Sequence, residues 1–222
     1  MLFEKLETDL KLQLLLIENA SRIQDYAPVD LSEVSLQTKQ INASSHRQLD
    51  TYLEKVRQQT NAKVLYGGYL EKRNLYANSK LFNSEQVRNI HLGVDFWAPS
   101  RTGILAPLDG IVHSAHYNKG EANYGGTIIL KHLHLGFTFY SLYGHLSKAS
   151  LSLQKGEFTG KGAIFCHLGE PHENGNYVPH LHFQWILDLP ENAVDYPGVC
   201  AEAQIADFAR NSPKPNVIIE NS

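Results

Sequence analysis

The sequence contains few cysteines, little net charge and no long hydrophobic run. Cys166 and Cys200 are the only cysteines among 222 residues, which is too few for a disulfide framework, and they lack the CxxC spacing of a thiolate zinc site. The formal net charge is -3, so there is no strongly basic surface and we expect no nucleic-acid partner. A metal site in this chain must therefore use imidazole and carboxylate ligands.

The N-terminal region lacks the features of a membrane span or a secretory signal. Its apolar run between Leu12 and Ile17 is short and follows three acidic residues, Glu4, Glu7 and Asp9. A secretory signal begins with positive charge, and a membrane helix needs about 20 apolar residues. As written, the sequence predicts a cytoplasmic protein without a membrane span, and it leaves the oligomeric state open.

The first 60 residues have the spacing of helices. Apolar residues recur every three or four positions over residues 2–24, which predicts an amphipathic helix that Pro28 terminates. A second helix is predicted after Ser44 or Ser45, since either can cap its N-terminus and the apolar residues from Leu49 to Val56 follow at helical spacing.

After residue 68 the sequence changes to short β-rich runs separated by glycine. The runs cover residues 110–116, 127–132, 137–143, 163–168 and 181–187. His134-Leu135-Gly136 is typical of the turn in a hairpin. The predicted fold class is α+β, organised as an N-terminal helical segment (1–64), an antiparallel β domain (65–190) and a C-terminal extension (191–222).

Histidine is abundant, with 11 residues, and three segments combine it with other chemically active side chains. They are His91-Leu-Gly-Val-Asp95, Tyr143-Gly-His145-Leu146 and His180-Leu-His182-Phe183. In a strand, residues two or four apart project from the same face. We therefore expect His91 to share a face with Asp95 and His180 with His182, while Val94, Leu181 and Phe183 point into the core.

This set of side chains suits a catalytic zinc site. Such a site takes three protein ligands from histidine or acidic residues and keeps a fourth position for water. His91, Asp95 and one histidine of the pair His180 and His182 satisfy that count, and two histidines then remain near the open position.

The remaining histidines are interpreted as structural or solvated residues. His132-Leu-His134 repeats the local HxH pattern, so this pattern alone is not specific, and we place these two residues at a hairpin. The others are His46, His113, His116, His167 and His172. Tyr143 is expected to pack in the core, with a catalytic role as the alternative.

The three segments, in this order, resemble the lysostaphin-type or LytM-like zinc metallo-endopeptidases, which cut peptide cross-links in bacterial peptidoglycan. The resemblance covers about residues 65–187. Its further matches are Ala98-Pro99, residues 106–112 and Tyr124-Gly-Gly126. The chain departs from the family pattern in the loop 173–179 and in its helical first 60 residues.

The resemblance implies a lysostaphin-like β domain that holds one zinc ion per chain. His91 and Asp95 match the family's HxxxD ligands, and His182 matches its third ligand. His145 and His180 match two catalytic histidines that do not bind the metal, and their separate roles stay unassigned. The implied activity is hydrolysis of peptide bonds in peptidoglycan through a zinc-activated water, and the family usually acts in the cell envelope.

Three alternatives remain open at this point. The domain could be a non-enzymatic binding or activator module of the same fold, or a metallohydrolase that acts on another peptide or amide. Two histidines and a carboxylate also suit the iron of an oxygenase. A further hypothesis is that the N-terminal helices or the segment 66–88 cover the cleft as a built-in inhibitor.

Overall fold

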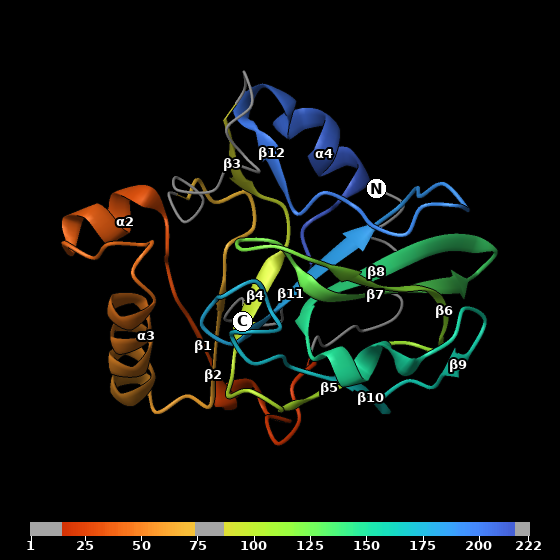
Figure 1. Ribbon diagram of the computed structural model, residues 1–222, viewed down its shortest axis with the longest axis horizontal. Coiled ribbons are helices and arrows are strands. Elements are labelled where there is room, and N and C mark those ends of the chain that lie inside the picture. The colour runs from red at the N-terminus through yellow and green to blue at the C-terminus, as the bar shows by residue number, and fades with distance from the viewer. Residues whose placement is uncertain (1–14, 74–86, 216–222) are drawn as a thin grey trace.

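The computed structural model describes residues 15–73 and 87–215, and its main element is an eight-stranded sheet (Figure 1). The strands are, in spatial order, β1 (Tyr26–Pro28), β2 (Val64–Gly67), β4 (Val94–Trp97), β11 (His180–Ile186), β8 (Phe137–Leu146), β7 (Gly125–His134), β6 (Gly110–Asn118) and β9 (Phe158–Thr159). β1 and β2 are parallel, and every other neighbouring pair is antiparallel.

Two small sheets and a few helices complete the described structure. β5 (Gly103–Leu105) pairs with β10 (Ile164–His167), and β3 (Arg88–His91) pairs with β12 (Val199–Ala201). The α-helices are α2 (Glu33–Thr38), α3 (His46–Thr60) and α4 (Ile205–Asn211), and the 3-10 helices are η1 (Ile23–Asp25), η2 (Lys148–Ser152) and η3 (Glu202–Gln204). In Figure 1, α2 and α3 lie beside β1 and β2, whereas α4 lies beside β12.

The central core lies on one face of the large sheet, because alternate side chains of β11 point to opposite faces. Leu181, Phe183 and Trp185 are fully buried in this core, together with Ile104 of β5. The expected inward direction of Leu181, Phe183 and Val94 is confirmed. His180, His182 and Gln184 consequently point to the other face of β11.

The helix predicted after Ser44 or Ser45 is confirmed as α3. Ser45 is its N-cap, and its Oγ accepts a hydrogen bond from the backbone N–H of Gln48. The helix ends at Asn61, which adopts a left-handed conformation with φ 53°. Leu49 and Leu53 are buried in a second apolar cluster with residues of the β1 and β2 region.

The helix predicted over residues 2–24 is wrong for residues 15–22, and residues 1–14 lie outside the described part. Leu16 accepts a backbone hydrogen bond from Leu105, and Ile17 forms an antiparallel bridge with Ile104. The backbone is thus paired with β5 and cannot form a helix here. The apolar spacing reflects burial in the central core instead, where both Leu16 and Ile17 lie.

The predicted fold class, α+β with an antiparallel β domain, is confirmed. The division at residues 64 and 190 stays a prediction, and both flanking segments pair with the central one, through β1 on β2 and β12 on β3. Among residues 15–73 and 87–215, no helix combines the length and apolar character that crossing a membrane requires.

Candidate metal centre

Neighbouring strands bring His91, Asp95 and His182 together. Asp95 on β4 lies directly opposite His182 on β11 in the strand register. His91 ends β3, and a short bend at residues 92–93 separates it from β4, so HxxxD is not one continuous strand. Even so, Asp95 Oδ1 lies 3.2 Å from His91 Nε2 and 3.2 Å from His182 Nδ1.

These three atoms fit a single metal ion. His91 Nε2 and His182 Nδ1 are 2.8 Å apart. Zinc ligands at bond lengths near 2.1 Å in a tetrahedron stand about 3.4 Å from one another, so the separations are close to those a bound ion requires. Asp95 Oδ1 is buried and has no hydrogen-bond partner in the described part of the chain, as expected of an oxygen whose partner is a cation.

Hydrogen bonds on the far side of each ring fix which nitrogen is available. His91 Nδ1 donates to Gly68 O at 2.9 Å, and His182 Nε2 donates to Gln184 Oε1 at 3.0 Å. Gln184 is itself oriented because its Nε2 donates to Ser212 Oγ. The two rings therefore present His91 Nε2 and His182 Nδ1 as lone-pair donors, which is the arrangement that supporting hydrogen bonds give to metal-binding histidines.

The second oxygen of Asp95 is held by a buried arginine. Arg73 Nη1 lies 2.5 Å from Asp95 Oδ2, and Arg73 Nε lies 2.6 Å from Glu71 Oε1. The motifs did not identify Gly68, Glu71, Arg73 or Gln184. Of these, only Gln184 carries a signal in the sequence, since it stands two residues after His182 on the same strand face.

Burial and charge keep His91 and Asp95 in the protonation states that metal binding requires. Burial, with a contribution from Arg73, lowers the pKa of His91 to about 4. Burial would raise the pKa of Asp95, but His91 and Arg73 oppose it and hold that pKa well below its ordinary value. At neutral pH the site therefore offers a neutral imidazole and an ionised carboxylate.

His145 and His180 lie beside this centre, with ring centroids 4.2 Å apart. His145 is near the end of β8 and has a φ of 64°, a strained conformation for a residue other than glycine. His145 Nδ1 donates to Asn174 O and His180 Nδ1 donates to Val178 O, so both Nε2 atoms are left for the cleft. Burial lowers the pKa of both histidines, so both are neutral at neutral pH.

All five predicted site residues line one cavity of about 350 Å³. Trp97, Tyr124 and Tyr177 supply aromatic walls. Leu31 and Leu49 of the N-terminal region also line it. Residues 74–86 lie outside the described part, so the hypothesis that segment 66–88 covers the cleft stays a prediction.

Tyr143 has the packing role that was expected. It is fully buried in the central core, on the side away from the cleft, and its ring contacts Phe165 and Phe183. Its hydroxyl accepts a hydrogen bond from Ser141 Oγ. A side chain so enclosed cannot reach a substrate in the cavity.

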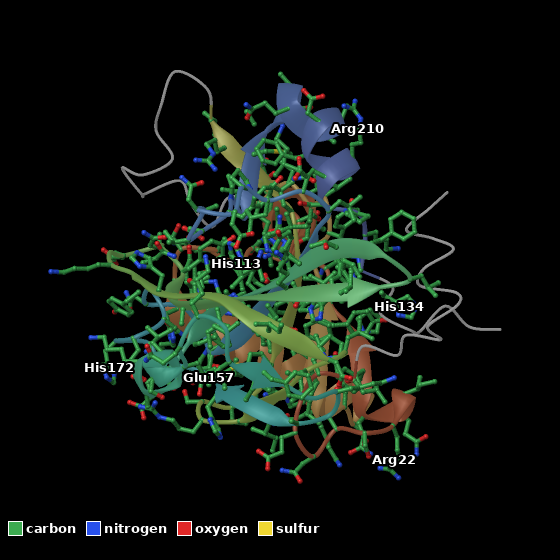
Figure 2. The ribbon with its side chains drawn as sticks, turned by 90° about the vertical axis from the view of Figure 1, so that its right-hand side faces the viewer. Arg22, His113, His134, Glu157, His172 and Arg210 are labelled. Atoms are coloured by element: carbon green, nitrogen blue, oxygen red, sulfur yellow. The ribbon has the colours of Figure 1, made fainter. Side chains whose placement is uncertain are left out.

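The second HxH pair does not join the site. His132 is buried beside Phe139 and Trp185, with its Nδ1 donating to Asp109 O. His134 lies near the end of the hairpin, and Figure 2 shows it and His172 at opposite sides of the view. The structural and solvated roles predicted for His132 and His134 agree with these positions.

Three ligand atoms thus converge beside one cavity, and two further neutral imidazoles line the same cavity. Residues 89–195 match the family described as "Peptidase family M23". This match confirms the resemblance to the LytM-like peptidases.

Individual relatives cover parts of the chain. A Haemophilus influenzae protein named "Uncharacterized metalloprotease" is 33% identical over 98 residues, which is 44% of this chain and 19% of the relative. The chain thus spans about a fifth of that relative's length. Among solved structures, the catalytic domain of the antimicrobial peptidase lysostaphin from Staphylococcus simulans is 23% identical, covers 64% of this chain and 87% of its own, and has a TM-score of 0.36.

Two further solved structures show a similar degree of likeness. A mutant catalytic domain of the prophage-encoded M23 protein EnpA from Enterococcus faecalis is 19% identical, covers 60% of this chain and 85% of its own, and has a TM-score of 0.41. A zinc-containing peptidase from Vibrio cholerae is 23% identical, covers 49% of this chain and 32% of its own, and has a TM-score of 0.37.

Proposed function

We propose that the chain is a zinc-dependent metallo-endopeptidase that hydrolyses peptide bonds, with peptidoglycan cross-links as its substrate. One observation carries the proposal: His91 Nε2, Asp95 Oδ1 and His182 Nδ1 converge at the floor of a cavity that His145 and His180 also line. The choice of peptidoglycan is supported by the family resemblance. The choice of zinc is supported by a donor set of two imidazoles and a single carboxylate.

His91, Asp95 and His182 would hold the zinc ion. When bound, zinc supplies a Lewis acid that activates water at neutral pH and polarises the carbonyl of the scissile bond. Gly68 O, Arg73 and Gln184 orient the three ligands through the hydrogen bonds on their far sides. The aromatic walls limit the water that enters beside the substrate.

His145 and His180 would move the protons. Because each Nδ1–H donates to a backbone carbonyl, each neutral ring presents an Nε2 lone pair to the cleft. Either ring can therefore accept a proton from the attacking water and deliver it to the leaving amine. The ring that holds the proton also becomes a hydrogen-bond donor for the oxyanion that develops on the carbonyl.

The first test is product mapping with the purified full chain. Peptidoglycan, pentaglycine peptides and unrelated peptides are incubated with the protein, with and without a chelator, and the products are identified by mass spectrometry. We expect cleavage of cross-link peptides that the chelator abolishes and added zinc restores. Cleavage of unrelated peptides alone would support the metallohydrolase alternative, and zinc binding without any cleavage would support a binding module.

The second test assigns the residues. His182→Ala and Asp95→Ala should lose both stoichiometric zinc, measured by elemental analysis, and hydrolysis. His145→Ala should keep zinc and lose turnover by about 100-fold or more, and His134→Ala is the matched control that should keep both. Full zinc retention in both ligand variants would overturn the assigned metal site, and iron in place of zinc would favour the oxygenase alternative.

A further inference from the structure

We infer that Arg73 is a positioning residue for the metal: it fixes the Asp95 carboxylate so that one oxygen alone faces the ion, and Glu71 holds Arg73 in place for this. The inference rests on the proposed zinc site. It assigns a role to two residues that lie outside residues 89–195, the part of the chain that matches the peptidase family.

Arg73 is enclosed by specific partners. Its side chain is 2% exposed, and its guanidinium lies over the ring of Trp97 at 5.7 Å. Glu71 Oε1 accepts a hydrogen bond from Arg73 Nε, and Glu71 Oε2 accepts one from the backbone N–H of Leu31. The segment is tied to β3, since Arg73 N donates to Asn89 O and His91 N donates to Glu71 O.

The two carboxylate oxygens of Asp95 have different partners. Oδ2 accepts from Arg73 Nη1, whereas Oδ1 faces His91 and His182 and has no hydrogen-bond partner in the described residues. A carboxylate without this support can rotate and offer both oxygens to a cation. Arg73 thus selects one-oxygen ligation and leaves a coordination position for substrate and water.

Glu71 explains why a positive side chain can stand so close to a cation site. The pair formed by Glu71 and Arg73 is neutral, so it orients Asp95 without adding repulsion for the incoming metal ion. A neutral residue at position 71 would remove one of the two carboxylates that pair with Arg73, in a buried environment where charges interact strongly. The two residues therefore have separable effects on metal binding.

The experiment compares full-length wild type with Arg73→Met, Arg73→Lys and Glu71→Gln. Arg22→Met is the matched control, because Arg22 also pairs with a buried aspartate, Asp25, and neither residue lines the cavity. Zinc affinity is measured on metal-free protein by competition with a chromophoric chelator, the geometry by the absorption spectrum of bound cobalt(II), and the fold by circular dichroism and thermal unfolding of the metal-free protein.

We expect Arg73→Met to weaken zinc binding about 10- to 100-fold, the loss typical of removing a group that orients a metal ligand. Its cobalt bands should also lose intensity as the coordination number rises. Arg73→Lys should recover part of the affinity, because one cationic nitrogen remains to donate to Asp95. Glu71→Gln should weaken zinc binding without changing the cobalt bands, because the amide oxygen can still accept from Arg73 Nε but carries no charge to offset the guanidinium. Arg22→Met should change neither.

Unchanged zinc affinity and cobalt bands in a folded Arg73→Met would overturn the inference. If Arg73→Met does not fold, Arg73→Lys and Glu71→Gln decide it, since wild-type behaviour in both would equally overturn it. Failure of the proposed function is recognised separately: wild type would then bind no zinc, or would bind zinc and cleave no peptide.

Discussion

The sequence His-Leu-His occurs twice in this protein, and the two copies lie in different surroundings because different strands pair with them. His182 on β11 lies opposite Asp95 on the neighbouring strand β4, whereas His132 on β7 lies opposite Phe139 on β8. His132 Nε2 contacts Ser141 Oγ at 2.7 Å inside an aromatic core. Of these two histidines, the candidate ligand is the one whose neighbouring strand supplies a carboxylate.

The buried His132 makes stability depend on pH. Burial lowers the pKa of His132 to about 4 from an ordinary value of 6.5, so between these values the unfolded chain binds the proton more readily than the folded protein. Folding stability should fall as pH decreases through 6.5, by up to about 3 kcal/mol from this residue at pH 4. His132→Gln should flatten that part of the curve, measured by urea unfolding at a series of pH values.

The comparison with His134→Gln provides the control for this prediction. His134 is partly exposed and lies on the same hairpin, so His134→Gln controls for the effect of the substitution itself. The other histidines are the same in wild type and His132→Gln, so only the difference between the two curves is attributed to His132. Identical slopes for wild type and His132→Gln would contradict the prediction.

The sequence motifs predicted the candidate ligands and catalytic histidines, because each motif lies within five residues. The supporting residues were not predictable in this way. Arg73 meets Asp95 across 22 residues, and Gly68 meets His91 across 23. Such pairs depend on how the segment before β3 packs, and no local pattern specifies that packing.

At the scale of elements, the bend between β3 and β4 determines how closely His91 approaches His182. Gly93 lies in this bend, where a Cβ atom would stand 2.7 Å from the His182 ring and 2.6 Å from Phe183 O. Both contacts are closer than real side chains allow. The glycine of the HLGVD segment is thus required by the space around the metal centre.

Gly93→Ala should therefore displace His182 and weaken zinc binding by about tenfold or more, a loss of the size seen when the support of a ligand is disturbed. Zinc affinity of the purified variant is the measurement. Gly160→Ala is the matched control, because a Cβ there meets its nearest atom at 3.7 Å. Wild-type zinc affinity in Gly93→Ala would contradict this account of the bend.

The two predicted N-terminal helices show which elements a sequence can specify. α3 carries its own boundaries, with Ser45 at one end and Asn61 at the other, and these are local signals. Residues 15–22 carry a helical spacing of apolar side chains, but pairing with β5 and burial in the core override it. A deletion of residues 1–60 would thus remove part of the core as well as any cover of the cleft.

For the whole molecule, the proposed metal connects strands that are distant along the chain. A bound ion would link β3, β4 and β11 and stabilise only the folded protein. At a free zinc concentration of 100 times the dissociation constant, this linkage contributes about 2.7 kcal/mol, which corresponds to roughly 5 to 10 °C in Tm for a chain of this size.

Removing zinc with a chelator should lower Tm by that amount in wild type. The same treatment should leave the Tm of Asp95→Ala unchanged, because that variant has lost a ligand. Differential scanning calorimetry at fixed pH measures both. An equal chelator effect on the two proteins would show that the ion acts elsewhere.

The large sheet has short strands at both of its margins. β1 has three residues and includes Pro28, and β9 has two. Long exposed edges are templates for addition of a strand from another molecule, and short edges with proline prevent this. The sheet that carries the candidate metal centre is accordingly protected against edge-to-edge aggregation, so high protein concentrations should not drive it toward fibrils by that route.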